Sequence, residues 1–281
     1  MRLDDNWPED TRKLLSEGNY LVTSLDWRYG YEELQEFDFI ASCTTGTDHL
    51  DSRDIPLISL KGESVLDDVY ATAEMAWALI LALVRRIPWA FEDVKRGNWN
   101  REAWQGTELR GKTLAIVGYG RVGQQMAKIA EAFGMKVIAS DVPSSRHDAP
   151  YRHHKLEFCI LETLLKNADI VTVHVPLNDK TRGMFGAEQF ALMQSTAYFV
   201  NTSRGAVVDT GALVTALENK QLAGAALDVL PGEPRPNIPE HPNLLITPHI
   251  AGNTAESRRK TQLHIAQRIK DYLGGVRHDR L

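Results

Sequence analysis

Between residues 112 and 250, short apolar runs alternate with amphipathic segments, and this alternation limits the possible fold more than any other feature. The runs are rich in Val, Ile, Leu and Ala and are bounded by Gly, Pro, Asn or Asp, which is typical of buried strands. Continuous apolar strands joined by helices form parallel sheets covered on both faces. The predicted fold class is therefore α/β, with a Rossmann-type doubly wound parallel sheet. The predicted strands are 113–117, 136–140, 170–175, 198–201, 225–230 and 244–247, and helices are predicted at 124–133, 161–166 and 211–218.

Helical patterns at 71–95 and 255–273 flank this region. The first is predicted as one long helix that ends near Gly97. A chain of 281 residues is long for a single hydrophobic core and commonly forms two domains. We expect a smaller, chain-discontinuous domain formed by 1–84 plus 253–281, and a doubly wound domain over 85–252.

Composition and charge exclude several classes of protein. The formal net charge is -5, and the longest basic cluster, 258–260, lies in a helical pattern as a solvated face, so no nucleic-acid partner is expected. The two cysteines, Cys43 and Cys159, form no disulfide framework, which favours a cytoplasmic protein. The most apolar stretch, 71–84, contains Glu74 and is too short to cross about 30 Å of hydrocarbon, so no membrane association is expected.

Residues 118–123 read Gly-Tyr-Gly-Arg-Val-Gly, which is the G-x-G-x-x-G spacing, directly after a predicted strand and before a predicted helix. In a dinucleotide site Gly118 permits the tight turn, Gly120 lets the backbone approach a pyrophosphate, and Gly123 allows close packing of helix on strand. The helix N-terminus then favours the phosphate charge. A purely structural glycine turn is the alternative.

The strand predicted at 136–140 ends at Asp141, at about the distance from the glycines where a carboxylate meets the adenosine ribose. Its charge should repel a 2′-phosphate, so NAD is predicted in preference to NADP. A nearby arginine, Arg146, weakens this preference because it can partner a phosphate.

Polar residues follow three later strands, where open α/β sheets place their ligands. Arg204 can clamp a carboxylate with its forked guanidinium and polarise the neighbouring oxygen. His249 can accept and return a proton near neutral pH, and Glu233 can orient its ring and stabilise the imidazolium. Each also has an ordinary interpretation, as a surface ion pair, a structural histidine or a solvated loop carboxylate.

With His-Val-Pro-Leu at 174–177, this ordered set of motifs resembles the D-isomer-specific 2-hydroxyacid dehydrogenase family, which includes phosphoglycerate, D-lactate and glyoxylate/hydroxypyruvate enzymes. The resemblance covers the chain from Ala41 onward. It implies hydride transfer between NAD and C2 of a small 2-hydroxy or 2-keto acid, with Arg204, Glu233 and His249 as catalytic residues. It also implies that Asp228 meets the nicotinamide amide. The implied cofactor residues are Gly118, Tyr119, Gly120, Arg121, Val122, Gly123, Asp141, His174, Val175, Pro176, Thr181, Thr202, Ser203, Asp228 and Gly252.

The resemblance further implies that Thr45 and Gly46, in the Cys43–Asp51 stretch, offer backbone N–H groups to the substrate carboxylate. A tight turn demanded by Gly46 is the alternative. Lys61 can contact an acidic substrate or pair with Glu63. No metal site is expected, because His147, His153 and His154 lack the spacing of known metal motifs.

The smaller lobe of the family is flavodoxin-like and usually has about five parallel strands. The segment before Cys43 is short for that number, so a truncated lobe is expected. Its uncovered apolar surface and the family's dimer-forming helix, matched here by 71–84, predict a homodimer.

Three functions remain open at this point. The complete set of Arg204, Glu233 and His249 favours an active 2-hydroxyacid dehydrogenase. The shortened lobe leaves room for an NAD-binding sensor or scaffold with little activity. Oxidation of formate or phosphonate on the same scaffold is a third alternative, although no dedicated site for either substrate is recognisable.

Overall fold

A computed structural model describes residues 7–16, 18–25, 28–142 and 156–278. Its contacts divide the chain into two compact units, Met1–Val69 with Asn253–Leu281, and Tyr70–Gly252. Each unit has its own sheet. None of the helices in these ranges combines the length and the apolar character that a membrane crossing needs.

The larger unit is built on a seven-stranded parallel sheet, in the order β10-β9-β8-β7-β4-β5-β6. Successive residues of a strand face opposite sides of the sheet, as at Ile116 and Val117, which belong to two different core clusters. The central strands β4, β7, β8 and β9 are almost fully buried because both faces are covered, whereas β5 and β6 carry the exposed Lys136 and Glu157. The predicted Rossmann-type α/β sheet is confirmed. Its strands are β4 (Thr113–Val117), β5 (Lys136–Ser140), β6 (Leu156–Phe158), β7 (Ile170–Val173), β8 (Tyr198–Asn201), β9 (Gly224–Leu227) and β10 (Leu244–Ile246).

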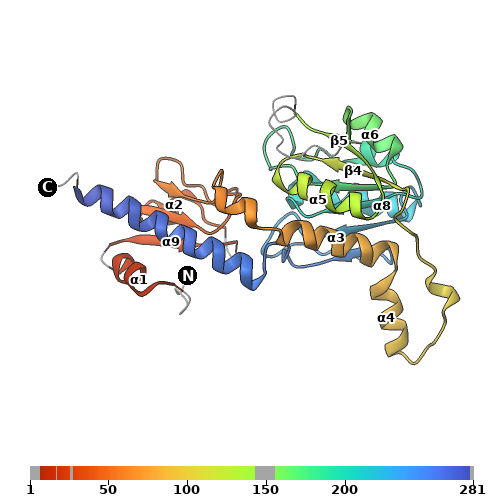
Figure 1. Cartoon of the computed structure of the whole chain (residues 1–281), viewed down its shortest axis with the longest axis horizontal. Coiled ribbons are helices and arrows are strands. Elements are labelled where there is room, and N and C mark those ends of the chain that lie inside the picture. Colours follow the sequence, from red (N-terminus) through yellow and green to blue (C-terminus); the bar gives the residue numbers. More distant parts are fainter. Residues whose placement is uncertain (1–6, 17, 26–27, 143–155, 279–281) are drawn as a thin grey trace. The chain divides into compact units, whose positions relative to one another are not determined.

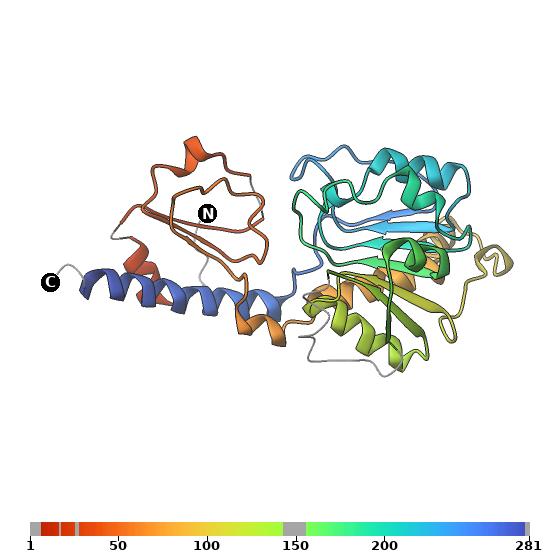
Figure 2. The ribbon, with the colours of Figure 1, turned by 90° about the horizontal axis from the view of Figure 1, so that it is seen from above.

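Helices cover the two faces of this sheet (Figures 1 and 2). On one face α3 (Ala71–Val84) packs on β8 and β9, and α5 (Arg121–Ala132) packs on β4 and β5. The other core cluster draws side chains from α6 (Leu161–Asn167), α7 (Ala187–Ala191) and α8 (Thr210–Glu218). Because all seven strands are parallel, their carboxyl ends lie along the same edge of the sheet, and helices cover both of its faces.

The prediction of a single helix over 71–95 is wrong, because the structure has two helices there. α3 ends at Val84 and α4 (Ile87–Lys95) follows it, with Arg86 between them in a left-handed conformation at φ 54°. Pro88 lies in the first turn of α4 and has no N–H to continue the preceding helix. The carbonyl of Val84 instead accepts a hydrogen bond of 2.8 Å from Thr107 N.

The domain boundary also differs from the expected position. α3 belongs to the larger unit, so the first crossing lies between Val69 and Tyr70 rather than after residue 84. The second crossing lies between Gly252 and Asn253, where it was expected.

The smaller unit has a three-stranded parallel sheet in the order β1-β2-β3. Helix α9 (Ala255–His278) packs on β2 and β3, and α2 (Tyr31–Leu34) contributes Leu34 to a separate cluster with Ile40. The sheet is parallel, and both the flavodoxin-like character and the truncation of this lobe stay predictions. The remaining elements are β1 (Tyr20–Thr23), β2 (Phe39–Ser42), β3 (Leu57–Ile58), α1 (Glu9–Leu15), η1 (Ser64–Asp68), and, in the larger unit, η2 (Glu102–Trp104) and η4 (Gly205–Val207).

Candidate active site

The glycine turn after β4 has the geometry that its three glycines were expected to provide. Gly118 has φ 93°, and a Cβ atom there would lie 2.7 Å from the His174 carbonyl oxygen. At Gly123 an added Cβ would lie 2.2 Å from the Gly118 carbonyl oxygen, so α5 packs directly against the turn. Gly120 caps α5 and has open space where its Cβ would point. The exposed side of the turn is therefore backbone that a ligand can approach closely.

The carboxylate of Asp141 lies beside this turn, at the end of β5. Its Oδ2 accepts a hydrogen bond of 2.7 Å from Tyr119 N, and its Oδ1 accepts one of 2.6 Å from Val142 N. Asp141 thus holds the glycine turn to the neighbouring strand. Arg146 lies outside the described residues.

The segment after β7 forms one wall of the turn. His174 donates its backbone N–H to the Val117 carbonyl at 2.8 Å, and its ring Nε2 lies 2.8 Å from Thr172 Oγ1. Although His174 as a whole keeps some exposure to solvent, burial of the ring lowers the pKa of His174 to about 3, so the ring is neutral at physiological pH. Further along, Thr181 donates its hydroxyl to the Pro176 carbonyl at 2.6 Å and so fixes the loop.

The loop after β8 carries Arg204. The buried Asn201 accepts from Ser203 N at 2.9 Å and donates to the Arg204 carbonyl at 3.0 Å. The Arg204 guanidinium donates from Nη1 to the Ser203 carbonyl at 2.8 Å. The next residue, Gly205, packs so closely on the loop after β9 that an added Cβ would lie 2.0 Å from the Leu230 carbonyl carbon.

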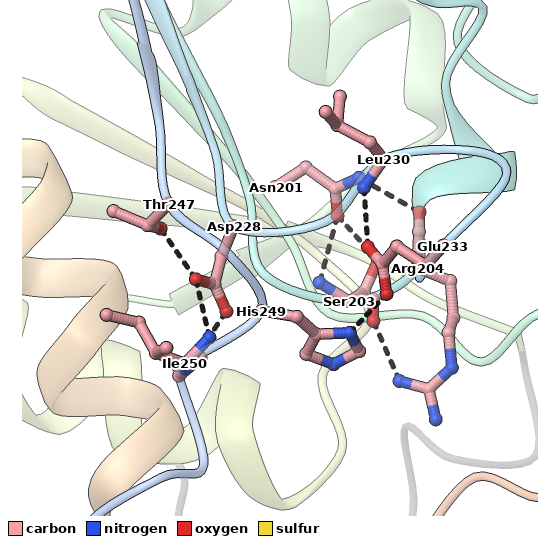
Figure 3. A network of polar contacts seen from close by, with 10 residues as sticks. Asn201, Ser203, Arg204, Asp228, Leu230, Glu233, Thr247, His249 and Ile250 are labelled. Atoms are coloured by element: carbon pink, nitrogen blue, oxygen red, sulfur yellow. Dashed lines mark hydrogen bonds and ion pairs between the residues drawn. The ribbon is translucent and has the colours of Figure 1, made fainter. Parts of the chain in front are cut away.

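Glu233 and His249 form a direct pair across two loops. Glu233 Oε2 lies 2.5 Å from His249 Nδ1, and Glu233 Oε1 accepts 2.7 Å from Leu230 N. Their side chains are largely buried, with 19% exposure for His249 and 26% for Glu233. Figure 3 shows these two residues and Arg204 coming together from three separate loops.

The environment keeps Glu233 ionised. Partial burial raises the pKa of Glu233, but the hydrogen bonds from His249 and Leu230 N, with the nearby charges of His249 and Arg204, lower it by more. The net pKa of Glu233 is therefore below its ordinary value of 4.5. At neutral pH Glu233 is a carboxylate that can only accept from the imidazole.

Asp228 fixes the loop that carries His249. Its side chain is fully buried, and Oδ1 accepts from Thr247 Oγ1 at 2.6 Å and from Ile250 N at 2.9 Å, while Oδ2 accepts from Ala251 N at 2.8 Å. Between these anchors His249 has φ 52°, a left-handed conformation that is costly for a residue with a Cβ. The anchors therefore hold a backbone geometry that the chain would not adopt unaided (Figure 3).

The residues at the sheet edge fit a bound dinucleotide. The open space above Gly120 and the N-terminus of α5 suit a pyrophosphate. Thr202 is only 6% exposed, and its hydroxyl has no hydrogen-bond partner among the described residues, as expected of a group that awaits a ligand. The other residues expected at this site lie on the same loops, namely Arg121 and Val122 at the start of α5, Val175 beside the Gly118 turn, and the exposed Gly252 after the Asp228 anchors.

The substrate-binding role of Thr45, Gly46 and Lys61 in the smaller unit stays a prediction. Gly46 accepts a hydrogen bond of 2.7 Å at its carbonyl from Thr44 Oγ1, and Thr45 is exposed. The Lys61 side chain is also exposed, and Glu63, its alternative partner, pairs instead with His264 at 2.7 Å and with Arg268.

Among the described residues, no group of three or more His, Cys, Asp or Glu side chains is placed to hold a metal ion. His147, His153 and His154 lie outside those residues. Sequence reasoning placed Asn201 at the start of a polar strand-end segment, but it gave neither Asn201 nor Thr247 a role in this site. Their position at the end of a strand, next to a polar loop, was the available signal.

Comparison with known proteins agrees with this geometry. The profile described as D-isomer specific 2-hydroxyacid dehydrogenase, NAD binding domain, matches residues 77–251. The chain is 43% identical to glyoxylate reductase from Aeropyrum pernix over 73% of this chain and 64% of that protein. It is 38% identical to D-3-phosphoglycerate dehydrogenase from Methanocaldococcus jannaschii over 87% of this chain and 47% of that protein.

Among solved structures, D-lactate dehydrogenase from Aquifex aeolicus, complexed with NAD and lactic acid, is similar with a TM-score of 0.79 and 27% identity. The similarity covers 94% of this chain and 85% of that one. The chain therefore belongs to the D-isomer-specific 2-hydroxyacid dehydrogenase family and carries its NAD-binding domain. It spans roughly half to two thirds of the length of the curated relatives compared above.

Proposed function

We propose that the protein is an NAD-dependent D-2-hydroxyacid dehydrogenase that acts on a small 2-keto or 2-hydroxy acid. The observation that carries the proposal is the contact between Glu233 and His249, 2.5 Å apart, beside Arg204 at the carboxyl edge of the sheet. The names of the relatives, glyoxylate reductase and D-3-phosphoglycerate dehydrogenase among them, support a 2-keto acid as substrate.

The pair of Glu233 and His249 sets which ring nitrogen does the chemistry. Because the carboxylate only accepts hydrogen bonds, Nδ1 keeps its proton and Nε2 is the atom left to exchange one. During reduction of a keto acid, the imidazolium donates the Nε2 proton to the C2 oxygen. During oxidation, neutral His249 accepts the hydroxyl proton at Nε2, and Glu233 stabilises the resulting cation.

Arg204 binds and orients the substrate in this proposal. Its guanidinium can pair with the substrate carboxylate and polarise the C2 carbonyl. A bound nicotinamide supplies the two-electron chemistry, since it gives or accepts a hydride. The ring of His174, kept neutral by burial, does not compete as an acid.

A panel of keto acids tests the proposal. Purified protein with NADH is assayed for loss of NADH absorbance with glyoxylate, hydroxypyruvate, pyruvate, 2-ketoglutarate and 3-phosphohydroxypyruvate, and NADH binding is measured in parallel by fluorescence. We expect turnover of at least one of these acids. Tight NADH binding without turnover of any acid would contradict the proposal and favour the sensor or scaffold alternative.

We also propose a homodimer in the cytoplasm. No residue of α4 is buried, and Phe91, Val94 and Trp99 expose large apolar side chains on α4 and the segment after it, which extends from the sheet in Figure 1. A second copy is the occupant that the family resemblance favours. The small number of cysteines, two in 281 residues, supports a reducing compartment. Light scattering after size-exclusion chromatography checks the dimer, and a monomeric mass would contradict it.

A further inference from the structure

Asn201, the last residue of β8, is fully buried although its side chain is a primary amide. A buried amide destabilises the folded state unless its donors and acceptor find partners. Oδ1 accepts from Ser203 N at 2.9 Å and from Ser203 Oγ at 2.7 Å, and Nδ2 donates to the Arg204 carbonyl at 3.0 Å. All these bonds go to the two residues at the tip of the loop.

The direction of these bonds fixes the orientation of the amide. A backbone N–H can only donate, so the atom that faces Ser203 N is the amide oxygen, and the NH₂ group faces the Arg204 carbonyl. None of the side-chain bonds links Asn201 to a neighbouring strand. The amide therefore shapes the path of the main chain from β8 to Arg204.

The loop is held from its other side as well. Gly205 lies against the Leu230 carbonyl, where an added Cβ would approach to 2.0 Å. Leu230 N in turn donates to Glu233 Oε1 at 2.7 Å. Figure 3 shows the Asn201 amide bonded to Ser203 and Arg204, and Leu230 N bonded to the Glu233 carboxylate. A change at Asn201 is thus transmitted first to Arg204, whose Nη1 bonds to the carbonyl of Ser203 in the same turn.

We propose that Asn201 is a positioning residue for the reaction: it holds Arg204 where the guanidinium meets the substrate carboxylate, and it does not touch the substrate itself. This inference rests on the proposed function. A displacement of about 1 Å in a group that orients a substrate can lower the rate by about 10²-fold. The role predicts a larger defect in substrate binding and turnover than in cofactor binding, to which Ser203 on the same loop is expected to contribute.

The first experiment compares Asn201→Ala with Val200→Ala, a variant of the preceding residue. Val200 is as deeply buried as Asn201, but it lies in the apolar core and its side chain has no polar group. We expect Asn201→Ala to raise KM, lower kcat, and reduce kcat/KM by about 10²-fold. The apparent Kd for NADH should change by much less than kcat/KM in Asn201→Ala and should stay near the wild-type value in Val200→Ala. Val200→Ala should lower the thermal midpoint while KM stays near the wild-type value.

A double-mutant cycle with Arg204→Ala decides whether Asn201 acts through Arg204. If it does, Asn201→Ala causes almost no further loss of kcat/KM in the Arg204→Ala background. An equal loss in both backgrounds, a parallel loss of NADH affinity, or a defect no larger than that of Val200→Ala would overturn the inference. If Asn201→Ala does not fold, Asn201→Ser keeps a small polar group there but cannot reach the Arg204 carbonyl, and the same outcomes apply to it.

Failure of the proposed function is distinguishable from failure of this inference. If the wild-type protein reduces no keto acid in the panel, the dehydrogenase proposal fails by itself. Binding of oxamate, a keto-acid analogue with a carboxylate, to the NADH complex then replaces turnover as the readout. Weaker oxamate binding to Asn201→Ala than to Val200→Ala would support the positioning role, and equal binding would overturn it.

Discussion

Replacement of Glu233 by Gln tests the acid–base pair most directly. The amide has the shape of the carboxylate, and its oxygen can still accept a hydrogen bond from Leu230 N or from His249 Nδ1. What the substitution removes is the negative charge beside the imidazole. Because that charge stabilises the imidazolium, its loss disfavours the protonated form of His249 that keto-acid reduction requires.

The structure sets the size of this effect. The two side chains are about three quarters or more buried, so an effective dielectric constant of about 20 applies, and opposite charges about 4 Å apart attract by about 4 kcal/mol. Partial desolvation of Glu233 offsets some of this attraction, which leaves about 1.5–3 kcal/mol, the usual range for hydrogen bonds to charged groups. That free energy corresponds to about a 10- to 10²-fold loss of kcat/KM in Glu233→Gln.

The assay is kcat/KM for keto-acid reduction at neutral pH. For Glu233→Gln we expect kcat/KM to fall by about 10- to 10²-fold, because the charge that stabilises the imidazolium is lost. Glu240→Gln is the matched control, because it removes one exposed carboxylate from the same long loop. A Glu233→Gln variant with the wild-type kcat/KM, or with a loss no larger than that of Glu240→Gln, would refute the reasoning.

Three further predictions concern the histidines and the glycine turn. His249→Asn should lower kcat by about 10²–10⁴-fold while NADH affinity measured by fluorescence is retained, since Asn tolerates the left-handed backbone at this position. Gly123→Ala should raise the Kd for NADH by at least about tenfold in a calorimetric titration, because the new Cβ would lie 2.2 Å from the Gly118 carbonyl oxygen and must displace the turn. The ring of His174, whose pKa is about 3, should show neutral ¹⁵N shifts in NMR spectra from about pH 5 upward, and titration above that pH would contradict its burial.

Stability at low pH follows from the sign of the shift at Glu233. Its pKa in the folded protein lies below 4.5, so its contribution to the free energy of unfolding is fully present above that pH. The contribution is lost as the pH falls through the folded value. Acid unfolding followed by circular dichroism should therefore show a shallower loss of stability below pH 4.5 for Glu233→Gln than for the wild type.

Six of the seven strands of the larger sheet were predicted from the sequence, because most of them are apolar runs buried on both faces. The seventh, β6, was not predicted, since it has only three residues and none of them is fully buried. Runs such as 113–117 and 198–201 can be recognised without knowing which strands they pair with, because a short, mainly apolar segment between turn residues is typical of a buried strand. The break between α3 and α4 was not recognised. The helical period continues through it, and the left-handed Arg86 and the role of Pro88 become visible only with the backbone.

The grouping of Arg204, Glu233 and His249 at the candidate site was predictable from the sequence, but the hydrogen bonds within the site were not. Arg204, Glu233 and His249 follow strand ends, so the sheet topology alone brings them to one edge. Asp228 was expected at the nicotinamide amide, whereas the structure commits both of its oxygens to Thr247 and to the backbone after His249. The path of a loop decides which donors reach a carboxylate, and residue spacing does not encode that path.

The site is held by buried polar groups at the strand ends rather than by the apolar core beneath it. Asn201 fixes the loop of Arg204, and Asp228 fixes the loop of His249. Each is fully buried, so each must keep its hydrogen bonds or leave a buried polar atom without a partner, which is unfavourable. An apolar core residue has no such directional requirement, and its truncation lowers stability through a cavity. Stability and catalytic geometry should therefore respond to different substitutions in this protein, even where the two positions are neighbours on β8.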